Sequence, residues 1–191
     1  PLGNGSGLSF SLATRNNTIG GTDPRARNVI SGNDNEGIAI RGSGHVVQGN
    51  YIGTDATGAI PIGNANKDGT SAGMMINGGL VTHDILIGGD SPAARNIISG
   101  NGNDGALNFA YGIHITNTGT NIFIQGNYIG TGANGVDDIG NHLSGINIAN
   151  GPVASKITIG GELPGEGNLI AGNGENGVYV SGLPSTSATS I

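Results

Sequence analysis

Asn28-Val29-Ile30-Ser31-Gly32-Asn33 is a hexad that the chain repeats with small changes. It returns at residues 96–101 as Asn-Ile-Ile-Ser-Gly-Asn and at residues 168–173 as Asn-Leu-Ile-Ala-Gly-Asn. Looser copies begin at Asn50 and Asn127, where both read Asn-Tyr-Ile-Gly-Thr. A motif that recurs at separations of tens of residues is typical of a repeat architecture, in which neighbouring repeats share one core.

Composition alone would allow disorder, because 39 of the 191 residues are glycine and only 10% are charged. Isoleucine and valine nevertheless recur at fixed places, which indicates a folded chain. The net charge of −6, with no basic cluster, argues against a nucleic-acid partner. Cysteine is absent, so disulfide and thiolate chemistry are excluded. No apolar run approaches membrane-spanning length, so we expect no membrane span.

Each repeat contains three short apolar segments separated by glycine, asparagine and proline. Such segments predict short strands, and the absence of a sustained 3.6-residue period predicts almost no helix. Asn-Gly pairs often mark hairpins, but copies that follow one another in the same sense stack most simply as parallel strands with right-handed connections. The sequence therefore predicts an all-β, right-handed parallel β-helix (solenoid) of about five to six coils, with three short strands in each coil.

The coils form a single domain in this reading of residues 1–191. We place them near residues 7–33, 37–64, 73–101, 112–141, 145–173 and, in part, 177–191. Residues 2–4 already match residues 62–64, and neither end resembles a cap. We therefore expect a fragment of a longer repeat array, whose coil ends meet flanking repeats or neighbouring subunits.

Aligned coils place like residues in columns, as a stacked core requires at a strand spacing of about 4.8 Å. The first inward column is Ile30, Ile52, Ile98, Ile129 and Ile170. The second is Ile19, Val47, Ile87, Ile124 and Ile159. The third is Phe10, Ile40, Ile76, Ile115, Ile148 and Val180. An unbroken asparagine column predicts a hydrogen-bonded ladder at a turn: Asn28, Asn50, Asn96, Asn127 and Asn168.

The motifs at residues 17–21, 27–33 and 49–58 resemble repeats of large bacterial secreted or surface proteins that have the pectin-lyase-like fold. The resemblance covers essentially the whole chain. It implies a right-handed parallel β-helix and an extracellular or cell-surface location. It does not specify an activity, because this fold supports lyases, glycosidases, epimerases and adhesins.

Candidate catalytic groups are sparse. The outward column of the first strand is Ser9, Ala39, Met75, His114, Asn147 and Tyr179, which contains no carboxylate. His114 is a possible general base by residue type, but its neighbours predict a surface histidine. Asp137-Asp138 resembles the paired acids of glycosidases on this fold, yet its setting predicts a turn. Arg25, Arg27 and Arg95 follow prolines in loops, where we expect their stems to pack over the coil. We assign no catalytic residue.

Calcium is the cofactor with the best, though weak, support, since acids recur in turns rich in glycine and asparagine. The candidates are Asp34, Glu36, Asp104 and Glu175. Their spacing matches no standard calcium loop, and the four histidines lack zinc spacing, so we expect no bound metal.

Two further outward columns are apolar enough to bind a partner. They are Val29, Tyr51, Ile97, Tyr128 and Leu169, and Thr18, Val46, Leu86, Phe123 and Thr158. Tyr51, Phe123 and Tyr128 are the aromatic residues that could stack on a polysaccharide. The favoured alternative is that the long loops at residues 53–73 and 130–141 fold back and cover these columns.

Three functions follow from these observations. The leading hypothesis is a non-catalytic structural or adhesive solenoid segment of an extracellular bacterial repeat protein. The second is a polysaccharide lyase or related carbohydrate-active enzyme, which would need acids and a basic residue gathered on one face. The third is a fibre subunit that stacks end to end.

Overall fold

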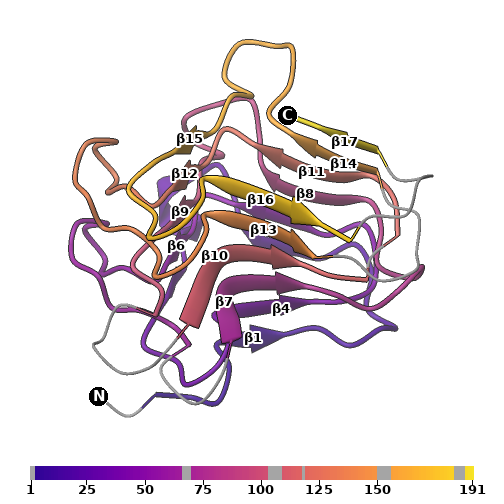
Figure 1. Cartoon of the computed structure of the whole chain (residues 1–191), viewed down its shortest axis with the longest axis horizontal. Helices are drawn as coiled ribbons and strands as arrows, with labels where there is room; N and C mark the ends of the chain where they lie inside the picture. The colour runs from indigo at the N-terminus through magenta and orange to yellow at the C-terminus, as the bar shows by residue number, and fades with distance from the viewer. Residues whose placement is uncertain (1–2, 66–69, 103–108, 118, 150–155, 183–187) are drawn as a thin grey trace.

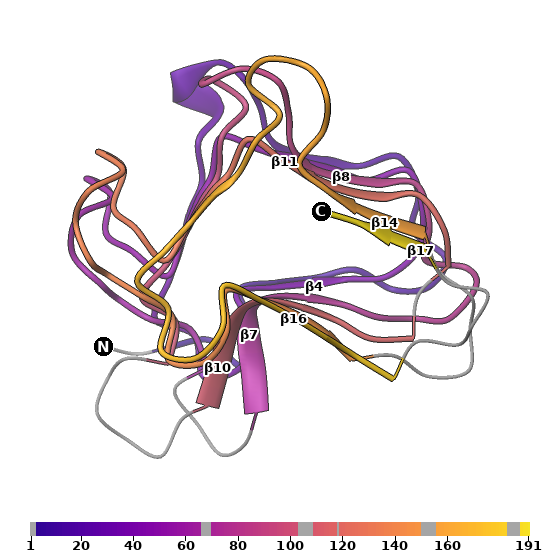
Figure 2. The same ribbon diagram turned by 45° about the horizontal axis from the view of Figure 1, so that its top comes forward.

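The computed structural model describes residues 3–65, 70–102, 109–117, 119–149, 156–182 and 188–191. Three parallel sheets wind around one axis as a right-handed β-helix (Figure 1), which confirms the predicted fold class. Viewed obliquely along its axis, the coil has a roughly triangular outline with loops projecting at the corners (Figure 2). A short 3₁₀ helix, η1 (Pro24–Ala26), interrupts one loop.

The first sheet contains one strand from each of six coils, in the order β1-β4-β7-β10-β13-β16. Its strands are β1 (Leu8–Ser9), β4 (Ile38–Ile40), β7 (Thr70–Ile76), β10 (Phe109–Ile115), β13 (Ile146–Ala149) and β16 (Val178–Ser181). Neighbouring strands belong to successive coils, so each parallel connection is one full turn of the solenoid.

The other two sheets follow the same order of coils. The second contains β2 (Thr18–Gly20), β5 (Val46–Gln48), β8 (Ile85–Gly88), β11 (Ile122–Gln125), β14 (Lys156–Ile159) and β17 (Ala188–Ser190). The third contains β3 (Val29–Ile30), β6 (Tyr51–Ile52), β9 (Ile97–Ile98), β12 (Tyr128–Ile129) and β15 (Leu169–Ile170). Within the described residues, no helix is long and apolar enough to cross a membrane.

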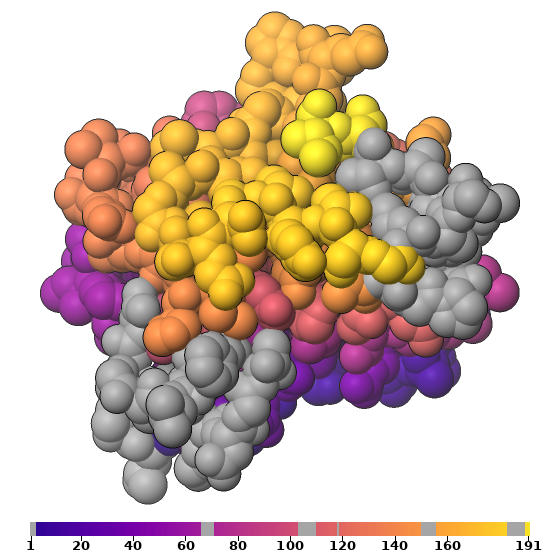
Figure 3. Space-filling model, in the orientation of Figure 1, coloured from indigo at the N-terminus to yellow at the C-terminus, as the bar shows by residue number. Residues whose placement is uncertain are grey.

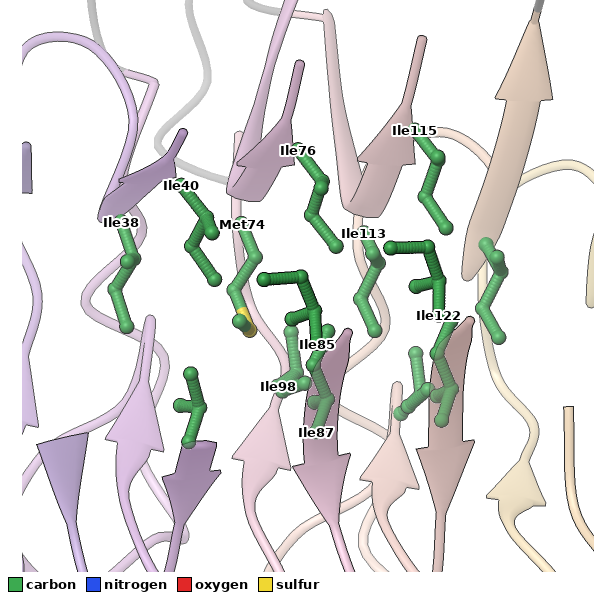
Figure 4. Close-up of a cluster of buried hydrophobic side chains, with 14 of the residues drawn as sticks. Ile38, Ile40, Met74, Ile76, Ile85, Ile87, Ile98, Ile113, Ile115 and Ile122 are labelled. Atoms are coloured by element: carbon green, nitrogen blue, oxygen red, sulfur yellow. The ribbon is translucent and has the colours of Figure 1, made fainter. Parts of the chain in front are cut away.

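The predicted inward columns are confirmed by the strand register. Ile52 pairs with Ile98, Ile87 with Ile124, and Ile115 with Ile148, as the alignment requires. Their side chains meet on the axis, where isoleucines of the first sheet point toward those of the other two (Figure 4). Because each isoleucine stacks on its counterpart one coil away, the core continues through the described coils without a break.

The predicted asparagine ladder is also confirmed, at the turn between the second and third sheets. Asn50 donates from Nδ2 to Oδ1 of Asn96 at 3.2 Å, and Asn96 donates likewise to Asn127 at 2.9 Å. Each rung also bonds the main chain: Nδ2 of Asn96 donates to the carbonyl of Val47, and its Oδ1 accepts from the amide of Asn50. The ladder therefore satisfies backbone groups that a tight buried turn would leave unpaired.

A second asparagine ladder, which sequence analysis missed, occupies the turn between the third and first sheets. Its six rungs are Asn4, Asn33, Asn64, Asn101, Asn141 and Asn173. The signal was present in the sequence, because Asn33, Asn101 and Asn173 close the three strict hexads. Asn64 and Asn141 end long insertions, so an alignment anchored on the hexad did not bring them into the same column.

Candidate binding site on the outer face of the first sheet

The outer face of β10, β13 and β16 gathers polar and aromatic side chains from three successive coils. The strand register places His114 beside Asn147 and Asn147 beside Tyr179, as the sequence columns predict. This face lies toward the viewer in Figure 1, and Figure 3 shows the last coil, in yellow, across it. On the other side of His114 the column continues with Met75, an apolar neighbour.

His114 differs from the predicted surface histidine. Its side chain is only half-buried, but both ring nitrogens are shielded from solvent and lack a hydrogen-bond partner. The ring packs against Tyr111, with 4.9 Å between the ring centroids and an angle of 57° between the planes. Burial lowers the pKa of His114 below its ordinary value, so the imidazole is neutral at physiological pH.

Asn147 lies under the same cluster and is 4% exposed. Its side chain shares a hydrogen bond with the hydroxyl of Tyr111, while its Oδ1 atom has no partner. In the described part of the chain, five buried side-chain polar atoms lack a partner, and three of them belong to His114 and Asn147. Such an atom costs about 1–3 kcal/mol, so this concentration is a candidate ligand site.

Glu175 adds a carboxylate that the sequence columns did not place here. It lies in the turn before β16, where its Oε2 atom accepts a hydrogen bond of 3.4 Å from Oγ of Ser144. Burial, and then the negative charge of Glu175, raise the pKa of Tyr111, so the Tyr111 hydroxyl stays protonated. The turn that was predicted as a calcium corner thus contributes to the outer face of the first sheet.

A hollow of about 560 Å³ lies at this cluster and is lined by Tyr111, Glu175, Asn176 and Tyr179. Tyr179 is 49% exposed, whereas Tyr111 is half-buried and connects the hollow to His114 and Asn147. None of the four lining residues is basic. These four residues therefore offer hydroxyl, amide and carboxylate groups beside an open aromatic ring, and Glu175 gives them a net negative charge.

One signal in the sequence could have indicated this site. Tyr111 occupies a position, two residues before an inward isoleucine, where the other coils have the non-aromatic residues Ser6, Glu36, Ala72, Ser144 and Asn176. A bulky aromatic residue at that position breaks the repeat, and Tyr179 breaks the outward column of the same sheet. Both are positions where stacking does not dictate the residue.

The weak calcium candidates are not brought together. Glu36 accepts a hydrogen bond from Ser6 at 3.2 Å, one coil from the N-terminal end. Glu175 lies four strand steps away, about 19 Å at the usual strand spacing. Asp34 lies in the same turn as Glu36, and Asp104 falls outside the described residues. Among the described residues, no three His, Cys, Asp or Glu side chains form a group that could hold a metal ion.

The aromatic residues expected to stack on a polysaccharide have a different environment. The guanidinium carbon of Arg27 lies 4.1 Å from the ring centroid of Tyr51, and that of Arg95 lies 3.9 Å from the centroid of Tyr128. The turn at Gly58 approaches the ring of Tyr51, which is 8% exposed. These tyrosines face the protein's own loops. Phe123, on the second sheet, is half-buried.

The remaining charged candidates lie in loops. Arg25 pairs with Asp23, and both side chains are well exposed. Arg27 and Arg95 donate from Nε to the carbonyls of Gly49 and Gly126, each at 3.1 Å. Asp137 and Asp138 are exposed in the loop between β12 and β13, where Asp138 forms an antiparallel bridge with Thr131. They belong to a turn, away from the first-sheet strands that carry His114 and Tyr179.

Fold and site together define a parallel β-solenoid with a polar, aromatic-rimmed hollow on its first sheet. The chain matches no family model, and searches of curated proteins and of solved structures find no significant match.

Proposed function

We propose that the chain is a non-catalytic structural and adhesive segment of an extracellular bacterial repeat protein. The observation that carries this proposal is the pair of asparagine ladders, which run beside the isoleucine core through successive coils. Two of the three corners of the coil are thereby tied to their neighbours by side chains as well as by strands. Such a coil is stiff along its axis, which suits a rod that displays loops and faces to a partner.

The extracellular and bacterial parts of the proposal rest on the resemblance to pectin-lyase-like repeats. The non-catalytic part is supported by the charge of the first-sheet face. Among the described residues that line its hollow, Glu175 is the one carboxylate and none is basic. Lyase and hydrolase chemistry on sugars usually requires paired carboxylates or an acid with a base in hydrogen-bonding geometry.

Activity assays test the non-catalytic part directly. The protein is incubated with pectin, polygalacturonate and neutral polysaccharides, while unsaturated products and new reducing ends are measured. We expect neither product above the rate of a heat-denatured sample. Turnover that disappears in the Glu175→Gln variant, but not in Glu162→Gln, would establish the alternative of a carbohydrate-active enzyme.

Single-molecule force spectroscopy tests the structural part. The chain is held at its two ends, and the force needed to unfold it is compared with that of Asn101→Ala, which removes a central rung of the second ladder. We expect a lower unfolding force for this variant, because each ladder bond between coils must break when a coil is peeled away. Equal forces for both proteins would show that the ladders do not stiffen the rod.

A second candidate, an end-to-end fibre, is favoured by one observation. At one end of the solenoid, core residues of the first described coil surround a hollow of about 630 Å³, and Leu8, Phe10 and Ile30 are only half-buried there. Another coil, from a flanking repeat or a neighbouring subunit, would cover these side chains and pair with β1, β2 and β3. Sedimentation velocity should then show growth with concentration, which Leu8→Lys suppresses. A monodisperse monomer at every concentration would exclude self-assembly.

A further inference from the structure

We propose that the outer face of β10, β13 and β16 binds a neutral saccharide in the hollow between Tyr111, Glu175 and Tyr179. This inference rests on the adhesive role proposed above and specifies the site and the chemistry of its ligand. Three features carry it: the concentration of unpartnered polar atoms, the charge of the hollow, and the open ring of Tyr179.

The unpartnered atoms match the hydrogen-bonding pattern of a sugar hydroxyl. A neutral imidazole has one donor and one acceptor nitrogen, and both nitrogens of His114 lack partners. Oδ1 of Asn147 is a further acceptor without a donor. A hydroxyl both donates and accepts, so vicinal hydroxyls of one sugar ring supply what these groups lack. Apolar ligands and simple ions do not supply both a hydrogen-bond donor and an acceptor.

Tyr111 connects these buried atoms to the hollow. Its ring packs against that of His114, its hydroxyl shares a hydrogen bond with Asn147, and the residue also lines the hollow. His114 and Asn147 lie behind Tyr111 rather than in the lining itself. Movement of the Tyr111 side chain, which lets a ligand hydroxyl reach them, is therefore part of the proposed binding event.

The charge of the hollow selects a neutral ligand. Glu175 is the one charged residue among the described residues of the lining, and its carboxylate accepts a long hydrogen bond of 3.4 Å from Ser144. Its remaining acceptor capacity suits the hydroxyls of a neutral sugar. A uronate would place a second carboxylate beside it, and none of the described lining residues is basic, so repulsion disfavours acidic polysaccharides.

Tyr179 supplies the stacking surface. This residue is 49% exposed on β16, next to Asn147 in the register. The apolar C–H face of a pyranose covers such a ring, while the equatorial hydroxyls point sideways toward Glu175 and Asn176. An aromatic ring with polar groups at its edge can contact an apolar face of a ligand while direct or water-mediated hydrogen bonds form at its rim.

The test measures binding of hexasaccharides by the full chain with isothermal titration calorimetry. Neutral hexamers of glucose, galactose and mannose are compared with hexagalacturonate of equal length. We expect binding of at least one neutral hexamer, and affinity at least tenfold lower for hexagalacturonate. Tyr179→Ala should weaken binding at least fivefold, whereas Leu163→Ala, which removes another exposed apolar side chain, should leave it unchanged.

Two further readouts keep the result interpretable. Glu175→Gln should improve binding of hexagalacturonate relative to the neutral hexamer, and the charge-matched Glu162→Gln should not. In a ¹⁵N spectrum of the imidazole rings of the native protein, the signals of His114 should shift on addition of the neutral hexamer. This measurement needs no substitution, so a misfolded variant cannot explain its result.

The outcomes separate the two proposals. Binding of hexagalacturonate as tight as that of every neutral hexamer would overturn the ligand class but leave an adhesive role. Failure of the whole panel to bind, with unmoved His114 signals, would overturn the site, while the force measurements on the ladders would still decide the structural role. Equal binding by Tyr179→Ala and the native chain would place the sugar elsewhere.

Discussion

The side-chain nitrogen of Asn101 donates a hydrogen bond of 2.8 Å to Oδ1 of Asn141, one coil further along the solenoid. In turn, Oδ1 of Asn101 accepts bonds from the amide and the side chain of Asn64, at 3.3 and 3.0 Å. All three residues are essentially inaccessible to solvent. Each buried rung therefore satisfies groups of two neighbouring coils, and its removal affects both.

Replacement of Asn101 by alanine should destabilise the protein by about 2–4 kcal/mol, because the buried amide and side-chain nitrogen of Asn64 lose the oxygen to which both donate. Oδ1 of Asn141 loses one of its two donors from residue 101 and keeps the main-chain amide. Urea unfolding at neutral pH measures the change. Asn4→Ala is the matched control, since Asn4 is an exposed rung at the end of the same ladder and bonds only Asn33 within it. A similar loss for both variants would contradict the argument that burial makes the central rungs important.

The stacked pair of Arg95 and Tyr128 makes a second prediction. The guanidinium lies 3.9 Å from the ring centroid, and its Nε atom donates to the carbonyl of Gly126. Arg95→Lys should cost about 1 kcal/mol, because an ammonium keeps the charge but loses both the planar stacking and this geometry. A double-mutant cycle with Tyr128→Leu isolates the stacking energy. The exposed Arg25→Lys should leave stability unchanged, and a coupling energy near zero would refute the contact.

Gly58 makes a third prediction, about the loop that covers Tyr51. Its φ of +71° is left-handed, and an added Cβ atom would lie 2.9 Å from the tyrosine ring. Gly79 has almost the same φ, +69°, but an added Cβ would meet nothing within 4 Å. Both Gly→Ala substitutions cost about 1 kcal/mol of backbone strain. Gly58→Ala should cost a further 1–3 kcal/mol from overpacking. Equal losses in thermal unfolding would show that the loop shifts freely off the ring.

Sequence alone was sufficient for the fold, because stacking repeats the same physical requirement in every coil. Ile30, Ile52 and Ile98 must be alike since each packs on the next, and the asparagines of the first ladder must be alike since each bonds the next. The alignment did not predict the second ladder because Asn64 and Asn141 follow insertions of unequal composition. Periodicity locates a residue only where the spacing is kept.

The outer cluster was less accessible to this kind of reasoning. His114, Asn147 and Tyr179 were correctly placed in one outward column, but nothing in the column indicates that both nitrogens of His114 are covered. The ring of Tyr111 packs against His114, and the charge comes from Glu175, which lies in a turn with its own conformation. Contacts between a strand and a turn of another coil have no period to reveal them.

Titration of His114 makes the fourth prediction. Its pKa is lowered in the folded protein by burial, so the unfolded chain binds a proton there more readily than the folded one. The neutral form of His114 therefore makes its full contribution to the free energy of unfolding at pH values well above the pKa of histidine in the unfolded chain, about 6.5. This contribution is lost as the pH falls through that pKa toward the lower pKa of the folded protein. The free energy of unfolding should drop between pH 7.5 and pH 5.5.

The variant His114→Phe separates this effect from that of the other histidines. Phenylalanine keeps an aromatic ring against Tyr111 but removes the proton and the two unpartnered nitrogens. We expect it to match or exceed native stability at pH 7.5, and to lose less stability than the native chain on going to pH 5.5. The aspartates whose pKa values are lowered, Asp23, Asp55 and Asp84, titrate below this window and do not interfere. An identical pH dependence in both proteins would mean that the His114 ring is open to water.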